Sequence, residues 1–136
     1  MQAAVIEPSL IGSEAVEAFP AGSPLFREGE IPRGVYVIRT GEVDVVFAAR
    51  NGNTRPFALA GPGQILGLSA VVTRRPHECS AITRTRCEIG FISQEALFRA
   101  LEEVPAVRFQ VLRILSSEVN AAYDAMRSRV YLNHAG

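Results

Sequence analysis

The chain has 136 residues, the size of a single domain. Apolar residues make up 48% of the sequence and charged residues 21%, a balance that excludes wholesale disorder. Its 14 basic residues are matched by 14 acidic ones, so the chain has no net positive charge with which to hold nucleic acid by counterion release. We therefore expect one globular domain that does not itself bind nucleic acid.

Short apolar runs separated by glycine and proline fill residues 15–92, a pattern that favours strands joined by tight turns. Residues 51–52 (Asn-Gly) form a hairpin-turn dipeptide, and residues 61–63 (Gly-Pro-Gly) interrupt the sheet before a new element. Eight short strands predict a mainly β fold, an antiparallel β-roll of jelly-roll type followed by C-terminal helices. The strands are expected at 15–19, 25–27, 34–40, 43–49, 55–60, 64–66, 78–85 and 87–92.

The spacing of apolar residues changes after the last predicted strand. Ser93 is a side-chain N-cap, which predicts a short helix over about 94–103. Pro105 fits the first turn of a second helix, and neither glycine nor proline interrupts the sequence that follows. We expect a long helix over about 106–132.

The long helix carries two apolar stripes. One recurs at steps of three or four residues with charged residues beside it, and a second copy of the chain is its simplest partner, so we predict a homodimer. The other stripe, Phe109, Val111 and Ile114, is expected to pack on the β-roll. A helix packed wholly on its own core is the alternative. The predicted dimer residues are Leu112, Leu115, Val119, Ala122, Met126 and Val130.

Five segments of the strand region carry glycine at characteristic spacings. They are Pro20-Ala21-Gly22, Leu25-Phe26-Arg27-Glu28-Gly29-Glu30, Gly34-Val35-Tyr36-Val37-Ile38, Thr40-Gly41-Glu42-Val43 and Gly61-Pro62-Gly63-Gln64-Ile65-Leu66-Gly67. Together with the order of elements, this set resembles the sensor domain of the Crp/Fnr family, the cyclic nucleotide-binding domain. The resemblance implies a single signal-sensing domain over residues 1–136 that takes part in transcription regulation.

The resemblance also implies a phosphate-binding cassette. In the family, backbone N–H groups at the start of a short helix cradle the cyclic phosphate, an arginine neutralises it and a glutamate binds the ribose 2′-hydroxyl. Leu68 stands at the glutamate position and Cys79 at the arginine position, and one extra residue lies between the two halves. Losing the arginine removes about 1.5–3 kcal/mol per bond, which makes cAMP a doubtful ligand. The predicted cassette contacts are Gly67, Leu68, Ser69, Ala70, Cys79, Ser80 and Ala81.

Three further side chains are candidates for ligand binding. Arg74 and Arg75 lie within the cassette and either could neutralise a phosphate, although a solvated pair, or an ion pair with Glu78, explains them without a ligand. The resemblance places Tyr123 of the long helix near the ligand base, where it could stack or simply fill the mouth of the roll. The expected effector is a cyclic nucleotide or another small anion, and no cofactor is assigned.

The sequence offers few residues for a metal site, an enzyme active site or a redox centre. Two histidines, His77 and His134, are too few for a metal-dependent active site, and we expect no enzyme. Two cysteines supply neither a disulfide framework nor an iron–sulfur cluster; haem ligation by His77 or Cys79 stays open, with His77 expected to be solvated. No window is apolar enough for a membrane span, so we expect a cytoplasmic protein.

The leading hypothesis is a dimeric sensor whose ligand shifts the cassette and the roll against the long helix. Transcription factors of the family continue into a helix-turn-helix, whereas this chain ends four residues after Leu132. We therefore expect either a sensor domain cut from a longer regulator or a stand-alone sensor. A ligand-free dimeric scaffold that kept the fold is the alternative.

Overall fold

The computed structural model describes residues 14–48, 54–118 and 120. After Val104 the chain is helical over 105–118 and at 120, the described part of the long helix. The elements before it are β1 (Ala15–Phe19), β2 (Pro24–Phe26), β3 (Gly34–Thr40), β4 (Val43–Ala48), β5 (Thr54–Ala60), β6 (Ile65–Leu66), α1 (Leu68–Thr73), β7 (Ser80–Thr83), β8 (Cys87–Ser93) and α2 (Gln94–Glu103).

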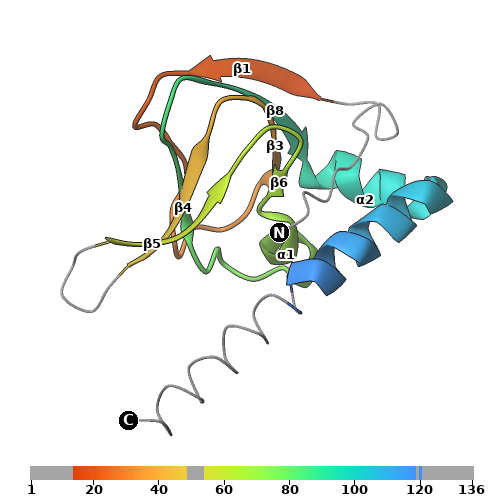
Figure 1. Ribbon diagram of the computed structural model, residues 1–136. Coiled ribbons are helices and arrows are strands. Elements are labelled where there is room, and N and C mark those ends of the chain that lie inside the picture. Colours follow the sequence, from red (N-terminus) through yellow and green to blue (C-terminus); the bar gives the residue numbers. More distant parts are fainter. Residues whose placement is uncertain (1–13, 49–53, 119, 121–136) are drawn as a thin grey trace, which may run out of the picture.

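The strands form two four-stranded antiparallel sheets. One sheet has the order β1-β8-β3-β6 and the other the order β2-β7-β4-β5, so the chain passes repeatedly from one sheet to the other. Figure 1 shows the strands wound into a roll, with α2 and the long helix together on one side of it. The predicted fold class, a mainly β antiparallel roll with C-terminal helices, is confirmed.

β3 is buried on both of its faces. Val35 and Val37 pack with the helices, whereas Ile38 and the half-buried Tyr36 face the interior of the roll. Successive side chains of a strand point to opposite faces, so a strand between two cores reads as a continuous apolar run. The sequence Gly-Val-Tyr-Val-Ile at the start of β3 has this form.

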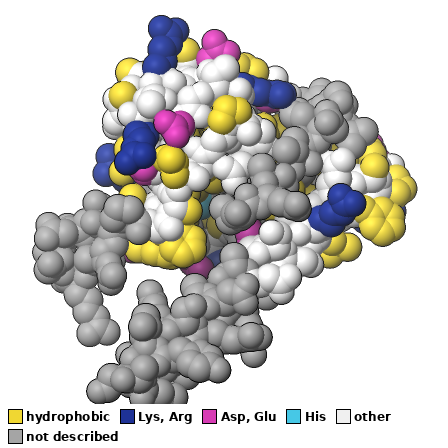
Figure 2. Space-filling view, in the orientation of Figure 1, with side chains coloured by type: hydrophobic (Ala, Val, Ile, Leu, Met, Phe, Trp, Pro, Cys, Tyr) yellow, Lys and Arg dark blue, Asp and Glu magenta, His cyan; other side chains and the backbone are white. Residues whose placement is uncertain are grey.

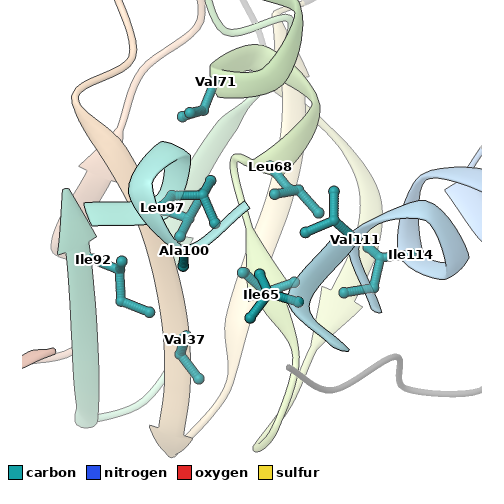
Figure 3. Close-up of a cluster of buried hydrophobic side chains, with 11 residues drawn as sticks. Val37, Ile65, Leu68, Val71, Ile92, Leu97, Ala100, Val111 and Ile114 are labelled. Atoms are coloured by element: carbon teal, nitrogen blue, oxygen red, sulfur yellow. The ribbon is translucent and has the colours of Figure 1, made fainter. Parts of the chain in front are cut away.

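Two groups of buried side chains make up the core. The first, the helix-side core, joins β3, β6, α1, β8, α2 and the long helix (Figure 3). Its members are Val35, Val37, Ile65, Leu68, Val71, Ile92, Leu97, Ala100, Val107, Val111 and Ile114. The second, the roll core, lies inside the β-roll and consists of Phe26, Ile38, Val43, Ala60, Ala81, Cys87 and Ile89.

The helices begin at identifiable residues. Ser93 caps α2, and its hydroxyl oxygen accepts a hydrogen bond from the N–H of Ala96 at 3.2 Å. Pro105 is the first helical residue after Val104, a position that needs no N–H donor. The predicted extension of the long helix beyond residue 120 and the Asn-Gly turn at 51–52 lie outside the described residues.

The second apolar stripe of the long helix is only partly as predicted. Val111 and Ile114 are buried in the helix-side core, but Phe109 is 70% exposed. Side chains advance by about 100° per residue, so Val107, Val111 and Ile114 share one face while Phe109 points away from it. The expectation that Phe109 packs on the β-roll is therefore wrong.

The seventh strand is shorter than the predicted 78–85. β7 spans Ser80–Thr83, and the chain bends at Arg84 and Thr85, whose amides both donate to the carbonyl of Glu42 at 2.8 and 3.4 Å. Sharing one acceptor ends the regular ladder with β4. The ends of the other strands coincide with the prediction or differ from it by a single residue.

Candidate functional site

The cassette, residues 67–81, begins with a left-handed glycine. Gly67 is the N-cap of α1 at φ +86°, a conformation that favours glycine. A Cβ at this position would also stand 3.3 Å from Cε1 of His77. The carbonyl of Gly67 accepts the N–H of Val71 at 3.2 Å, which closes the first turn of α1. Both the positive φ of residue 67 and its closeness to the His77 ring therefore favour glycine at this position.

The first three residues of α1 face different surroundings. Leu68 has no exposed surface and lies in the helix-side core, as Figure 3 shows. Ser69 is exposed, and its carbonyl accepts the hydroxyl of Thr73 at 2.7 Å. Ala70 is half-buried. Leu68 is thus a packing residue of α1, and its side chain is directed toward the helices.

The two arginines of the cassette end α1. Arg74 takes the left-handed conformation, φ 56° and ψ 40°, and its guanidinium carbon lies 5.2 Å from the ring centre of Phe98 on α2. This distance is typical of a cation–π contact. Arg75 is exposed, and its N–H donates to the carbonyl of Ala70 at 3.1 Å. In this structure Arg74 therefore stacks on α2.

His77 is buried, contrary to the expectation of a solvated loop histidine. Its side chain is 4% exposed, and its ring is stacked on Phe26 with 3.9 Å between ring centres and 15° between planes. Its backbone N–H donates to the carbonyl of Glu30 at 3.0 Å, and its carbonyl accepts the N–H of Gly29 at 2.8 Å. These two hydrogen bonds to the turn after β2 hold His77 in its buried position.

The start of β7 is fixed by the same turn. The hydroxyl of Ser80 accepts the N–H of Glu28 at 2.9 Å, and Ala81 is fully buried in the roll core. The Ser80–Ala81 pair thus ties the end of the cassette to the turn after β2. Both residues lie where the cassette resemblance places them, but no ligand contact of either is tested by the structure.

Cys79 is half-buried in electronegative surroundings. Burial, followed by the carboxylates of Glu28, Glu78 and Glu118, raises the pKa of the Cys79 thiol to about 11. A thiol with so high a pKa is neutral at physiological pH. The position that the resemblance assigns to a cation therefore carries no charge and lies under the influence of negative groups.

Part of the predicted dimer seam is described. Leu112 is 60% exposed, whereas Leu115 is half-buried against the helix-side core. The seam residues Val119, Ala122, Met126 and Val130, and the ligand candidate Tyr123, lie outside the described residues. A shallow groove of about 440 Å³ runs along the exposed side of the long helix. It is lined by Phe109, Leu112, Arg113, Ser116, Ser117 and Asn120.

Several residues of this region were not predicted from the sequence. Glu28 and Glu118 act on Cys79 from distant segments, and Phe26 stacks on His77. The available signal was the Gly29 turn, which lies in one of the segments that carry the family resemblance. That signal indicates a tight turn, but a turn by itself does not reveal which later residue it contacts.

The described residues offer little to other chemistries. Among residues 14–48, 54–118 and 120, no three His, Cys, Asp or Glu side chains form a group that could hold a metal ion. In that same part of the chain, no helix is both long enough and apolar enough to cross a membrane. On the face drawn in Figure 2, the arginines are scattered over the surface and form no single patch.

Comparison with known proteins identifies the family. A model of the cyclic nucleotide-binding domain matches residues 16–104. A CRP-like cAMP-activated global transcriptional regulator of Mycobacterium tuberculosis is 24% identical over 135 residues, covering 96% of this chain and 60% of that protein. The cyclic AMP receptor protein of Thermus thermophilus is 23% identical over 104 residues, covering 76% of this chain and 48% of that protein.

Solved structures agree on the fold. The catabolite activator protein of Thermus thermophilus superposes with a TM-score of 0.81 at 20% identity, covering 88% of this chain and 56% of that chain. The chain thus spans 60% or less of the length of these two curated relatives. The glycine-bearing segments, the two-sheet roll and the family match over residues 16–104 lead to one conclusion. The chain belongs to the cyclic nucleotide-binding domain family and is of the Crp/Fnr type.

Proposed function

We propose that the chain is a ligand-sensing, non-enzymatic regulatory domain whose cassette does not hold cAMP by the family's usual ionic contacts. The observation that carries the proposal is the setting of Cys79, where a neutral thiol stands under the influence of three carboxylates. A cyclic phosphate placed beside this thiol would gain no ion pair and would meet negative charge. The site therefore disfavours the anion that the arginine of the family attracts.

The ribose side of the cassette supports the same proposal. Leu68 replaces the family's glutamate, and its side chain is fully buried in the helix-side core. A leucine has no group that accepts a hydrogen bond from a ribose hydroxyl. Among the polar groups that remain at the cassette are the backbone N–H groups of α1 and the hydroxyls of Ser69 and Ser80.

Arg74 and Arg75 stay candidates for an anionic effector. To reach a phosphate, Arg74 would have to leave the ring of Phe98, a contact worth about 0.5–1 kcal/mol at an exposed site. Arg75 is exposed and would have to lose water and rotamer freedom. Either contact would be weaker than that of an arginine held in the position of Cys79.

We further propose that the effector acts through the long helix. Leu68 and Val71 of α1 share the helix-side core with Leu97 of α2 and Val111 of the long helix. A packed core of this kind transmits a shift of α1 as a change in the seating of both other helices. The effector would select one seating over another.

The proposed output is a change in a homodimer. Phe109 and Leu112 are 70% and 60% exposed beside the groove of the long helix. Large apolar side chains gathered on one face of a helix favour a protein partner over water. A second copy of the chain would cover both residues and extend along the predicted seam.

Calorimetric titration with cAMP tests the proposal. For the unsubstituted chain we expect no binding tighter than millimolar. Cys79→Arg should raise the affinity for cAMP by about tenfold or more, the effect of one charge-assisted bond. Cys79→Ser is the matched control and should leave the affinity unchanged. Micromolar binding of cAMP by the unsubstituted chain would contradict the proposal.

The same titration separates sensor from scaffold. Loss of both ionic readers, at Leu68 and Cys79, is also what a ligand-free dimeric scaffold would tolerate. A panel of cyclic mono- and dinucleotides that gives no heat, with the dimer intact, would favour the scaffold. An absorption spectrum of freshly purified protein addresses haem, since a Soret band would establish a haem sensor instead.

A further inference from the structure

His77 joins three parts of the cassette region. Its backbone pairs with Gly29 at 2.8 Å and with Glu30 at 3.0 Å, in the turn after β2. Its ring stacks on Phe26, and its Cε1 lies 3.3 Å from the point where a Cβ of residue 67 would stand. The backbone of His77 thus ties the segment after α1 to the turn after β2, and its buried imidazole lies against Phe26 and close to Gly67 at the start of α1.

The surroundings of the imidazole are mostly apolar. Neither β2 nor α1 has a titratable side chain. Burial lowers the pKa of His77, and the carboxylate of Glu30 offsets part of this effect. Tyr36 of β3 contacts Phe26 with 5.6 Å between ring centres, and burial raises the pKa of its phenol, which is therefore neutral. The remaining charged residues nearby in the sequence are Arg27, Glu28, Arg33, Arg74, Arg75 and Glu78.

Because the pKa of His77 is lowered, the stability of the folded arrangement around it depends on pH. We call the folded arrangement, with the imidazole of His77 buried, the closed form, and an arrangement with the imidazole exposed the opened form. When the closed form holds the pKa of the histidine below its ordinary value of about 6.5, it binds a proton less readily than the opened form does. The closed form of the His77 region therefore has its full stability above about pH 6.5. It loses stability as the pH falls from there through the lowered pKa. The Glu30 carboxylate reduces this loss, and burial outweighs it.

We propose that His77 is a proton-operated latch on the cassette, which closes residues 74–79 against the turn after β2 when the imidazole is neutral and releases them when it is protonated. Release would also loosen α1, because the ring lies so close to Gly67 that an added Cβ would stand 3.3 Å from its Cε1, and Leu68 follows Gly67 directly. The proposed opening is argued from the fold and does not depend on the proposed function. Its role as a second signal, beside the effector, does rest on the proposed function.

The direct test is an NMR titration of the full chain carrying His134→Gln, in which His77 is the only histidine. We expect the imidazole of His77 to titrate below its ordinary value of about 6.5. The amide signals of Gly29 and Gly67 should shift with the same midpoint. A midpoint at or above the ordinary value, or amides that do not follow it, would overturn the latch.

Amide hydrogen exchange measures the opening. After correction for intrinsic rates, protection of residues 74–79 should fall as the pH is lowered from about 7.5 to about 5.5. The limit for opening coupled to one proton is about tenfold per pH unit. Residues 35–38 of β3 serve as the internal reference, and their protection should not fall with the same midpoint.

Two variants separate the charge from the packing. His77→Phe keeps an aromatic ring against Phe26 and removes the titration, so the acid-induced loss of protection should disappear. His77→Gln removes the titration without the added bulk and covers the case in which phenylalanine does not fit. Acid-induced opening that persists in a folded variant would overturn the latch. None of these measurements involves a ligand, so failure to bind nucleotides leaves their outcome unaffected.

Discussion

Leu68 shows how a single position can change from recognition to packing. The family resemblance assigns this position to a ribose-binding glutamate, yet here the side chain is fully buried among residues of three helices and three strands. A carboxylate cannot occupy that place without losing its hydration. The sequence shows only that an apolar residue stands where the resemblance expects a charged one. The structure shows that this side chain faces the helix-side core.

The first prediction concerns this position. Leu68→Ala should lower the free energy of unfolding by about 2–5 kcal/mol, the cost of a core cavity. Leu68→Glu should cost more at neutral pH, and the difference should shrink in acid, because burial raises a carboxyl pKa above about 4.3 and folding then favours the protonated form. Urea unfolding at several pH values measures both effects.

Leu68→Met is the matched control, since it nearly conserves volume and carries no charge; it should cost less than about 1.5 kcal/mol at every pH. If Leu68→Glu were as stable as the unsubstituted chain at neutral pH, the side chain would face solvent or a ligand. That result would restore the ribose-binding role to this position.

At the scale of elements, α2 connects the β-roll to the long helix. It follows β8 directly, contributes Leu97 and Ala100 to the helix-side core, and carries Phe98 beneath Arg74 of the cassette. Its start is fixed by Ser93, which is both the last residue of β8 and the N-cap. A change of one residue in this boundary would rotate the buried face of α2 by about 100°.

The second prediction is that the Ser93 cap stabilises the domain. Ser93→Ala leaves the N–H of Ala96 without its acceptor and should lower the free energy of unfolding by about 0.5–2 kcal/mol. Ser117→Ala, an exposed serine within the long helix, should be neutral or slightly stabilising because alanine is the better helix former. Thermal or urea unfolding compares the pair, and equal effects would show that Ser93 does not act as a cap.

At the scale of the molecule, the long helix has one face buried in the domain and one face exposed to solvent. Val107, Val111 and Ile114 are buried in the domain, while Phe109 and Leu112 face solvent beside the groove. Leu115 lies between the two faces, half-buried against the helix-side core. The exposed face is the part of the predicted dimer seam that the described residues contain.

The third prediction tests this face. Leu112→Arg should yield a monomer on size-exclusion chromatography or sedimentation with little change in the unfolding of the monomer, since the side chain is 60% exposed. Leu115→Arg should also give a monomer, but with a loss of stability, because its side chain contacts the core. Glu103→Arg, exposed at the end of α2, is the control. A dimer that persists in both leucine variants would place the interface elsewhere.

Much of the fold was predictable because it depends on local chemistry. Strand β3 follows from a continuous run of apolar residues and helix α2 from the Ser93 cap, and each has its predicted bounds. The position of His77 was not predictable. Its burial depends on hydrogen bonds to the turn at Gly29 and Glu30, almost fifty residues earlier in the chain. The same holds for Cys79, whose raised pKa depends in part on Glu28 and Glu118.

The sequence by itself determined the β-roll and the order of its C-terminal helices, because periodicity and caps act locally; residue identity led to the prediction that both charged readers of the cassette are replaced. Only the tertiary structure decided which faces are used. It turned Leu68 inward, turned Phe109 outward, and enclosed His77 between the turn and α1. The physical reason is that burial and electrostatic potential are sums over residues that folding brings together. Spacing along the chain does not contain those sums.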